Sequence, residues 1–161
     1  MTAEPLADAE LGLALLSAWS EAASRMADLP VYNPALDVRV TDVRRRGDWR
    51  IAVVVTPWFM NVVAVPDATV ELPADGAKLG LDLPAGAVEL VVATLPAIGR
   101  YGAASLFSPM DDFTDAETAW ATAVVCLDQL CTPPKPAESG PLATPVDRRS
   151  LFRFGLGGSR R

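Results

Sequence analysis

The sequence contains no histidine among its 161 residues. Histidine is the commonest general base, the usual partner of a nucleophilic serine or cysteine, and the commonest protein ligand for metals. Most acid–base, nucleophilic and metal-dependent enzymes are therefore poor interpretations of this chain, and we expect a protein that is not an enzyme. A pocket that holds a carboxylate of strongly perturbed pKa would be the feature that revives a catalytic interpretation.

Cysteine is nearly as scarce. The two cysteines, Cys126 and Cys131, cannot build a disulfide framework, and the sequence has no Cys-x-x-Cys pair. On a helix, residues five positions apart point about 140° away from each other, which is too divergent for one metal ion or an unstrained local disulfide. We interpret both cysteines as structural residues and predict no metal site and no cofactor.

Long hydrophobic runs are also missing. No apolar segment approaches the roughly 20 residues needed to cross a bilayer. Residues 1–5 lack the basic region that opens a secretory signal. We therefore predict a cytoplasmic protein without membrane insertion.

Acidic residues outnumber basic ones by 20 to 14, and the two kinds are unevenly distributed. Residues 1–131 contain 8 Lys and Arg against 18 Asp and Glu, whereas residues 132–161 contain 6 against 2. An acidic body is a poor binder of nucleic acid and suits a cationic peptide. Because residues 132–161 are also rich in Pro, Gly and Ser, we predict one folded domain over residues 1–131 followed by a flexible basic tail.

Two segments have the spacing of amphipathic helices. Over residues 6–28, apolar side chains recur at steps of three and four: Leu11, Leu15, Trp19, Ala22 and Met26. A second stripe runs over residues 115–131, and Thr114 with Glu117 matches a capping box at its start. Since each helix has a single apolar stripe, we expect each to lie on a sheet.

The segments between the helices have the patterns of strands joined by turn residues. Residues 38–43 and 49–55 form one predicted hairpin, and residues 88–95 and 101–107 form another. The three arginines at 44–46 favour a solvated loop over a phosphate-binding patch. We predict an α+β fold in which an antiparallel sheet of about five strands, built from hairpins, is packed on one face by the N-terminal and the C-terminal helix.

The most informative segment is Thr56-Pro57-Trp58-Phe59-Met60-Asn61, which lies between two apolar, strand-like runs. Three large apolar side chains, those of Trp58, Phe59 and Met60, follow a proline, and such side chains are costly to expose. Either they are buried at a sheet corner or they line a surface that takes an apolar partner. Both alternatives stay open, and we treat the three residues as candidates for partner binding.

A second candidate group consists of Met110, Asp111 and Asp112. Two adjacent carboxylates can serve acid–base chemistry, but near the start of a helix they more often stabilise the helix dipole. They would also provide negative potential beside an apolar surface. We predict that all three residues belong to the same partner-binding surface as the first segment.

Three blocks of sequence carry a resemblance: residues 56–61, then Tyr101 with residues 105–110, then residues 148–152. They resemble the HybE-type (HupJ-like) family of chaperones that assist the assembly of nickel-iron hydrogenases. The resemblance implies a non-catalytic factor that binds the hydrogenase small subunit and recognises its twin-arginine signal peptide, with the large subunit or other maturation proteins as further partners. The alternative is a structural adaptor that contacts folded subunits rather than the signal.

One segment of the predicted tail is itself similar to a twin-arginine signal. Arg148 and Arg149 are followed by a serine and then by Leu151 and Phe152. This segment cannot act as an export signal, because no apolar stretch follows it. We predict that it is a pseudo-client that occupies the signal site weakly. The alternative is a solvated basic end that aids solubility.

Overall fold

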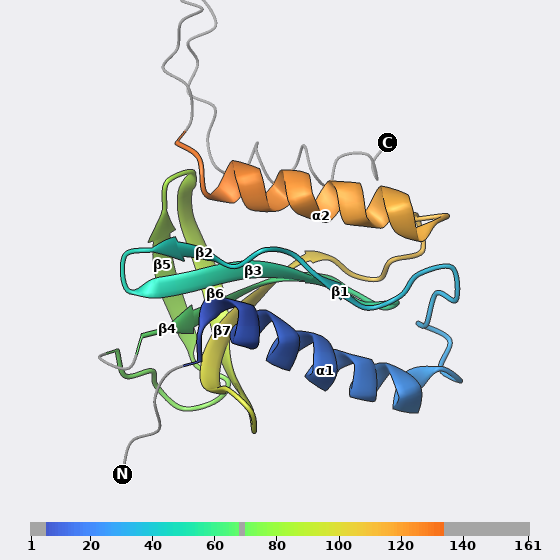
Figure 1. Ribbon diagram of the computed structural model, residues 1–161, viewed down its shortest axis with the longest axis horizontal. Helices are drawn as coiled ribbons and strands as arrows, with labels where there is room; N and C mark the ends of the chain where they lie inside the picture. Colours follow the sequence, from blue (N-terminus) through green and yellow to red (C-terminus); the bar gives the residue numbers. More distant parts are fainter. Residues whose placement is uncertain (1–5, 68–69, 134–161) are drawn as a thin grey trace, which may run out of the picture.

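A computed structural model describes residues 6–67 and 70–133, and the predicted tail segment 148–152 lies outside these residues. The chain forms two helices, α1 (Asp8–Met26) and α2 (Ala116–Leu130), with all strands between them (Figure 1). The strands are β1 (Arg39–Val40), β2 (Arg44–Arg46), β3 (Trp49–Val55), β4 (Met60–Pro66), β5 (Lys78–Leu83), β6 (Gly86–Leu95) and β7 (Gly99–Phe107).

The strands form one antiparallel sheet in the order β1-β3-β4-β7-β6-β5. β1 pairs with the last two residues of β3, and β2 pairs with its first three. This arrangement confirms the predicted α+β class and the antiparallel sheet built from hairpins. The sheet has seven strands rather than about five. Two of these strands are short pieces beside β3. β1 covers only part of the predicted strand 38–43, and β2 consists of the three arginines that were predicted to form a loop.

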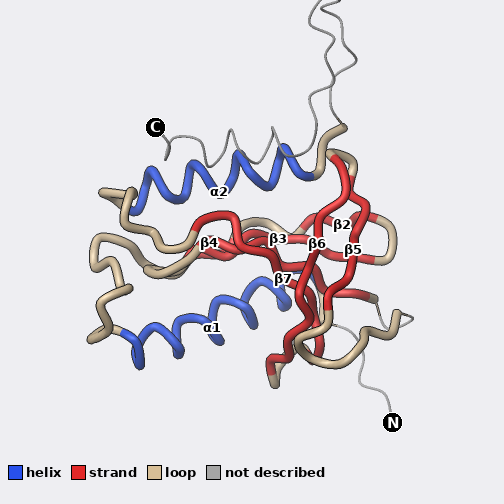
Figure 2. The backbone as a smooth tube through the Cα atoms, turned by 180° about the vertical axis from the view of Figure 1, so that it is seen from behind, coloured by secondary structure: helices blue, strands red, loops and turns tan. Residues whose placement is uncertain are grey.

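The two helices lie on opposite faces of the sheet, so the prediction that both pack on one face is wrong. Figure 1 shows α2 above the sheet and α1 below it, and Figure 2 shows the same separation from behind. Neighbouring residues of β3 confirm it, because successive side chains of a strand point to opposite faces. Val53 and Val55 pack in the core that α2 covers, whereas Ala52 and Val54 pack in the core that contains Leu11 and Leu15 of α1.

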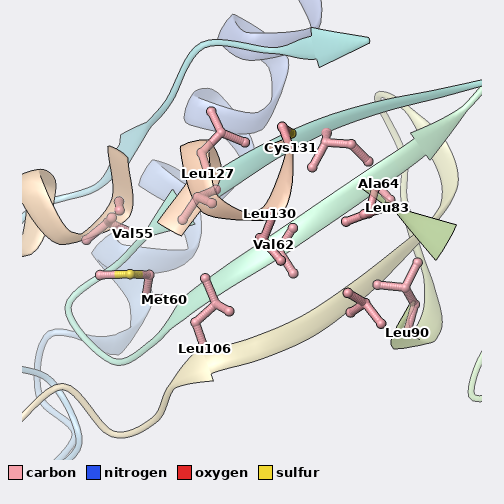
Figure 3. Close-up of a cluster of buried hydrophobic side chains, with 14 of the residues drawn as sticks. Val55, Met60, Val62, Ala64, Leu83, Leu90, Leu106, Leu127, Leu130 and Cys131 are labelled. Carbon is pink, nitrogen blue, oxygen red and sulfur yellow. The ribbon is translucent and has the colours of Figure 1, made fainter. Parts of the chain in front are cut away.

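The physical reason lies in the central strands. Residues 51–55 are apolar without interruption and all are buried, which is the pattern of a strand covered on both faces. A single apolar stripe on each helix cannot reveal which face that helix will cover. Figure 3 shows the core under α2, in which Leu127 of α2, Met60 of β4 and Leu106 of β7 belong to one cluster.

Helix α2 begins one residue later than the capping-box pattern predicts. Asp115 adopts an extended conformation, and its Oδ1 accepts a hydrogen bond of 2.7 Å from the backbone N–H of Thr118. That bond is the main cause that lowers the pKa of the Asp115 carboxyl. A carboxylate is a strong acceptor and also favours the positive end of the helix dipole, which explains why Asp115 rather than Thr114 is the cap.

The three arginines of β2 join the two helices to the sheet and are not a solvated loop. Arg44 forms an ion pair with Asp128 of α2, and Arg46 Nη2 donates to the carbonyl of Cys131 over 2.9 Å. Arg45 lies 3.2 Å from Asp8 in the first turn of α1. These contacts fix both helices at the end of the sheet where the β2–β3 hairpin turns.

Candidate functional site

The predicted segment 56–61 contains the turn between β3 and β4. Thr56 closes this turn, because its backbone N–H donates to the carbonyl of Phe59 over 2.8 Å. The hydroxyl oxygen of Thr56 also accepts from the backbone N–H groups of Phe59 at 3.0 Å and of Trp58 at 3.3 Å. The short turn thereby presents two aromatic side chains at the end of the sheet.

Those side chains join an aromatic cluster with two residues from distant parts of the chain. Trp19 of α1 packs edge-on against Phe59, with ring centroids 5.1 Å apart. Tyr32, in the link after α1, stacks on Trp58 at 6.3 Å. All four rings are half-buried. The alternatives of a core position and a surface position therefore both apply in part, because each ring packs on a neighbouring ring and each residue remains partly exposed.

Asn33 connects this cluster to the acidic segment. Its backbone N–H donates to the carbonyl of Pro57 over 2.9 Å. Its side-chain Nδ2 donates to the carbonyls of Met110 at 3.0 Å and Phe113 at 2.9 Å. The residues between those carbonyls, Asp111 and Asp112, form an exposed turn. One asparagine thus holds the aromatic turn and the acidic turn together.

The surface around this junction is both apolar and acidic. Leu29 and Val31 are 46% and 44% exposed, and they lie just before the stacked Tyr32. Neither Asp111 nor Asp112 makes an ion pair with a described residue. We call the whole area the loop-end surface, and it consists of Leu29, Val31, Tyr32, Trp58, Asp111 and Asp112.

Two of the predicted partner-binding residues lie in the core. Met60 and Met110 are each 0% exposed and pack in the cluster that α2 covers. The expectation that their side chains lie on the binding surface is corrected by this burial. Met60 is the first residue of β4, where the side chain points to the face opposite Asn61, and Figure 3 shows it directed into the core. Phe59 is half-buried against the α1 side.

The site also contains residues that sequence reasoning did not select. Tyr32 and Asn33 lie in an irregular link after α1, which has no periodic pattern. The available signal was an asparagine between two prolines, since asparagine side chains bond readily to nearby backbone groups in turns. Its own turn is of this kind, because Asn33 Oδ1 accepts from the N–H of Ala35 at 3.0 Å. Its partners at 110 and 113 could not be read from sequence.

No cluster of three or more His, Cys, Asp or Glu side chains suited to a metal ion occurs in the part of the chain that the structure describes. Burial raises the pKa of the Cys126 thiol to about 11 and also raises that of Cys131. Both thiols are therefore protonated at neutral pH and are weak nucleophiles. Neither α1 nor α2 is long and apolar enough to cross a membrane.

Comparisons with known proteins identify the relatives of this chain. A sequence model of the family described as NiFe-hydrogenase assembly chaperone HybE matches residues 10–154. The hydrogenase expression/formation protein HupJ of Bradyrhizobium diazoefficiens is 40% identical over 132 residues, which cover 80% of this chain and 78% of that protein. The hydrogenase expression/formation protein HoxT of Azotobacter vinelandii is 43% identical over 143 residues, which cover 86% and 91%.

The fold agrees with a solved structure of a relative. The solution structure of HybE from Escherichia coli matches this chain with a TM-score of 0.64 at 26% sequence identity. The match covers 89% of this chain and 92% of that chain. The family resemblance that the sequence blocks suggested is confirmed by both kinds of comparison.

Proposed function

We propose that this chain, which belongs to the HybE family of NiFe-hydrogenase assembly chaperones, is a non-catalytic factor that binds the small subunit of a nickel-iron hydrogenase and its twin-arginine signal peptide before export. One observation carries the proposal. Asn33 holds the turn with Asp111 and Asp112 beside the stacked pair of Tyr32 and Trp58. The result is an acidic edge next to an apolar face.

This combination matches the chemistry of the proposed ligand. A twin-arginine signal presents two guanidinium groups followed by an apolar segment. Guanidinium groups pair well with carboxylates, and an apolar helix or strand gains affinity by covering exposed apolar side chains. Asp111 and Asp112 would take the arginines, while Leu29, Val31 and Trp58 would contact the apolar segment.

The carboxylates and the apolar side chains should contribute unequally to the binding free energy. An exposed ion pair contributes about 0.2–1 kcal/mol, so two carboxylates alone give weak and salt-sensitive binding. Burial of apolar surface, at roughly 25 cal/mol per Å², supplies more. We therefore assign orientation and selectivity to the carboxylates and most of the affinity to the aromatic side.

The test is a titration of the fluorescently labelled signal peptide of the hydrogenase small subunit against the full chain. Asp111→Asn with Asp112→Asn should weaken binding by roughly twofold to thirtyfold, which corresponds to the loss of two exposed ion pairs. The matched control is Asp48→Asn with Asp82→Asn. It removes two charges from exposed aspartates without an ion pair to a described residue. Equal weakening by both double variants would reduce the effect to net charge and contradict the assigned site.

A second candidate function is a structural adaptor that contacts folded subunits. A groove of about 600 Å³ between α1 and the β1–β2 segment favours it, because this groove is lined by Leu13, which is 65% exposed. Co-purification separates the two functions. If the small subunit is captured equally well with and without its signal peptide, and Leu13→Ser abolishes capture, the adaptor function replaces the signal-binding one.

A further inference from the structure

We infer that the chain's own segment 148–153 occupies the loop-end surface when no client is bound, an inference that rests on the proposed function of that surface. Residues 148–153 lie outside the described residues. Three observations support the inference: the composition of segment 148–153, its distance along the chain from α2, and the acidic charge of the loop-end surface.

Charge complementarity is the first argument. Arg148, Arg149 and Arg153 surround the apolar pair Leu151 and Phe152 within six residues. This is the same combination of cationic and apolar groups that the loop-end surface is built to contact. A ligand of this kind that is part of the same chain competes with any ligand that comes from outside.

The positions of the described cations support the same occupant. The arginines of β2 are engaged with Asp8, Asp128 and the carbonyl of Cys131. Arg39 is engaged with Asp37 and Glu117, and Arg25 with Glu21. Asp111 and Asp112, in contrast, have no ion pair with any described residue. Beyond the described part, Arg153 lies between Phe152 and Phe154, and only Ser150 separates Arg149 from Leu151.

The chain beyond α2 is long enough to bring segment 148–153 back to the loop-end surface. Helix α2 has 15 residues and therefore spans about 22 Å. It begins beside the acidic turn and ends at Leu130, so the chain leaves it at the end of the molecule away from the loop-end surface (Figure 1). The 14 residues 134–147 can bridge at most about 50 Å. This length is ample for a return along α2.

The occupancy is weak enough for a client to displace the segment. A tether of this length gives an effective concentration on the order of 1 mM. If the segment binds with a Kd of about 0.5 mM as a free peptide, self-occupancy lowers the affinity for an outside ligand about threefold. A client with a longer apolar segment covers more of the surface and still binds.

The experiment measures how the full chain binds a labelled synthetic peptide that copies residues 145–156 of this chain. Three full-length proteins are compared by fluorescence anisotropy: the unchanged chain, Arg148→Ala with Arg149→Ala, and the matched control Arg160→Ala with Arg161→Ala. Each double variant removes two positive charges. We expect the first double variant to bind the peptide about threefold more tightly than the unchanged chain and the control to bind it equally. The difference should shrink in 0.5 M salt, where charges are screened within a few ångströms.

Three results would overturn the inference. They are equal affinity of all three proteins, equal tightening by both double variants, and no measurable binding of the peptide to any of them. Tightening that depends on protein concentration would also overturn it, because the segment would then occupy a second copy. The signal peptide of the hydrogenase small subunit is titrated in parallel. If it binds and the 145–156 peptide does not, self-occupancy fails and the proposed function stands. If only the 145–156 peptide binds, the proposed function fails.

Discussion

Asn33 and Met110 are 77 positions apart in the sequence, and the side-chain amide of Asn33 donates to the carbonyl of Met110 over 3.0 Å. A second bond from the same nitrogen, of 2.9 Å, reaches the carbonyl of Phe113. One side chain therefore fixes both ends of the turn that holds the two exposed aspartates. The position of the acidic edge relative to Trp58 depends on this asparagine.

Asn33→Ala is expected to destabilise the protein by about 1–3 kcal/mol, because two partly buried carbonyls lose their donor. It should also weaken binding of the signal peptide, since the acidic turn is no longer held beside the aromatic rings. Chemical denaturation and peptide titration measure the two effects. Asn33→Asp keeps the acceptor for Ala35 but replaces the donor with a charged oxygen that repels both carbonyls, so it should destabilise at least as much as Asn33→Ala. If Asn33→Asp behaves like the unchanged chain, the donated bonds do not matter.

Trp58 and Met60 are expected to respond in opposite ways. Met60→Ala removes a side chain that is 0% exposed and should cost about 2–5 kcal/mol of stability. The fraction that remains folded should bind the signal peptide normally. Trp58→Ala should weaken binding at least fivefold, because the indole ring that stacks on Tyr32 is removed from the apolar face. Normal binding by Trp58→Ala would place the apolar contact elsewhere.

Asp8 is expected to be a stabilising residue. Its Oδ1 lies 3.2 Å from Arg45 and 3.5 Å from Arg50, which is 4% exposed. Asp8→Asn leaves the buried guanidinium without its counter-charge, and about 1–3 kcal/mol of stability should be lost. Glu21→Gln breaks the exposed 3.6 Å pair with Arg25 and should change stability by less than about 0.5 kcal/mol. Equal effects in urea denaturation would contradict the role of burial.

Gly102 and Gly80 provide a matched pair in the sheet. A Cβ at Gly102 would lie 2.8 Å from Cδ1 and 3.0 Å from Cβ of Leu90, so Gly102→Ala should cost about 1–3 kcal/mol through overpacking. A Cβ at Gly80 meets nothing within 4 Å. Gly80→Ala should be neutral or stabilise by up to about 1 kcal/mol, because the unfolded chain loses freedom. Thermal unfolding of both variants checks the contrast.

The thiol of Cys126 predicts a loss of stability at alkaline pH. Burial raises its pKa from 9.0 to about 11 in the folded chain. Below pH 9 the thiol is protonated in both states, so the full stability is present. Between about pH 9 and 11 the unfolded chain releases the proton more readily, and stability falls. Cys126→Ala should show a smaller decline over that range. An identical decline in both proteins would contradict this assignment.

The sequence by itself determined the two helices, the longer strands and the family. Apolar steps of three and four identify both helices. A helix of 3.6 residues per turn places Leu15, Trp19 and Ala22 on one face, whereas a strand would point Ala22 away from Trp19. The hairpins follow from alternating strands joined by turn residues, such as Gly47 with its φ of 61° between β2 and β3. The segment 56–61 could be identified as a junction between two buried strands for the same reason. All of these signals are local.

The tertiary structure alone decided which face each helix covers and which candidate residues are accessible. An apolar stripe indicates that a helix must be covered. The two faces of β3 are equally apolar, so the stripe does not indicate which face the helix covers; contacts between distant segments decide it. In the same way, Trp58 and Met60 are both large and apolar. Only the register of Met60 with Val55 directs the methionine into the α2 core and leaves the tryptophan in the turn. The bonds from Asn33 to residues 110 and 113 join distant segments, and no local pattern encodes a contact between them.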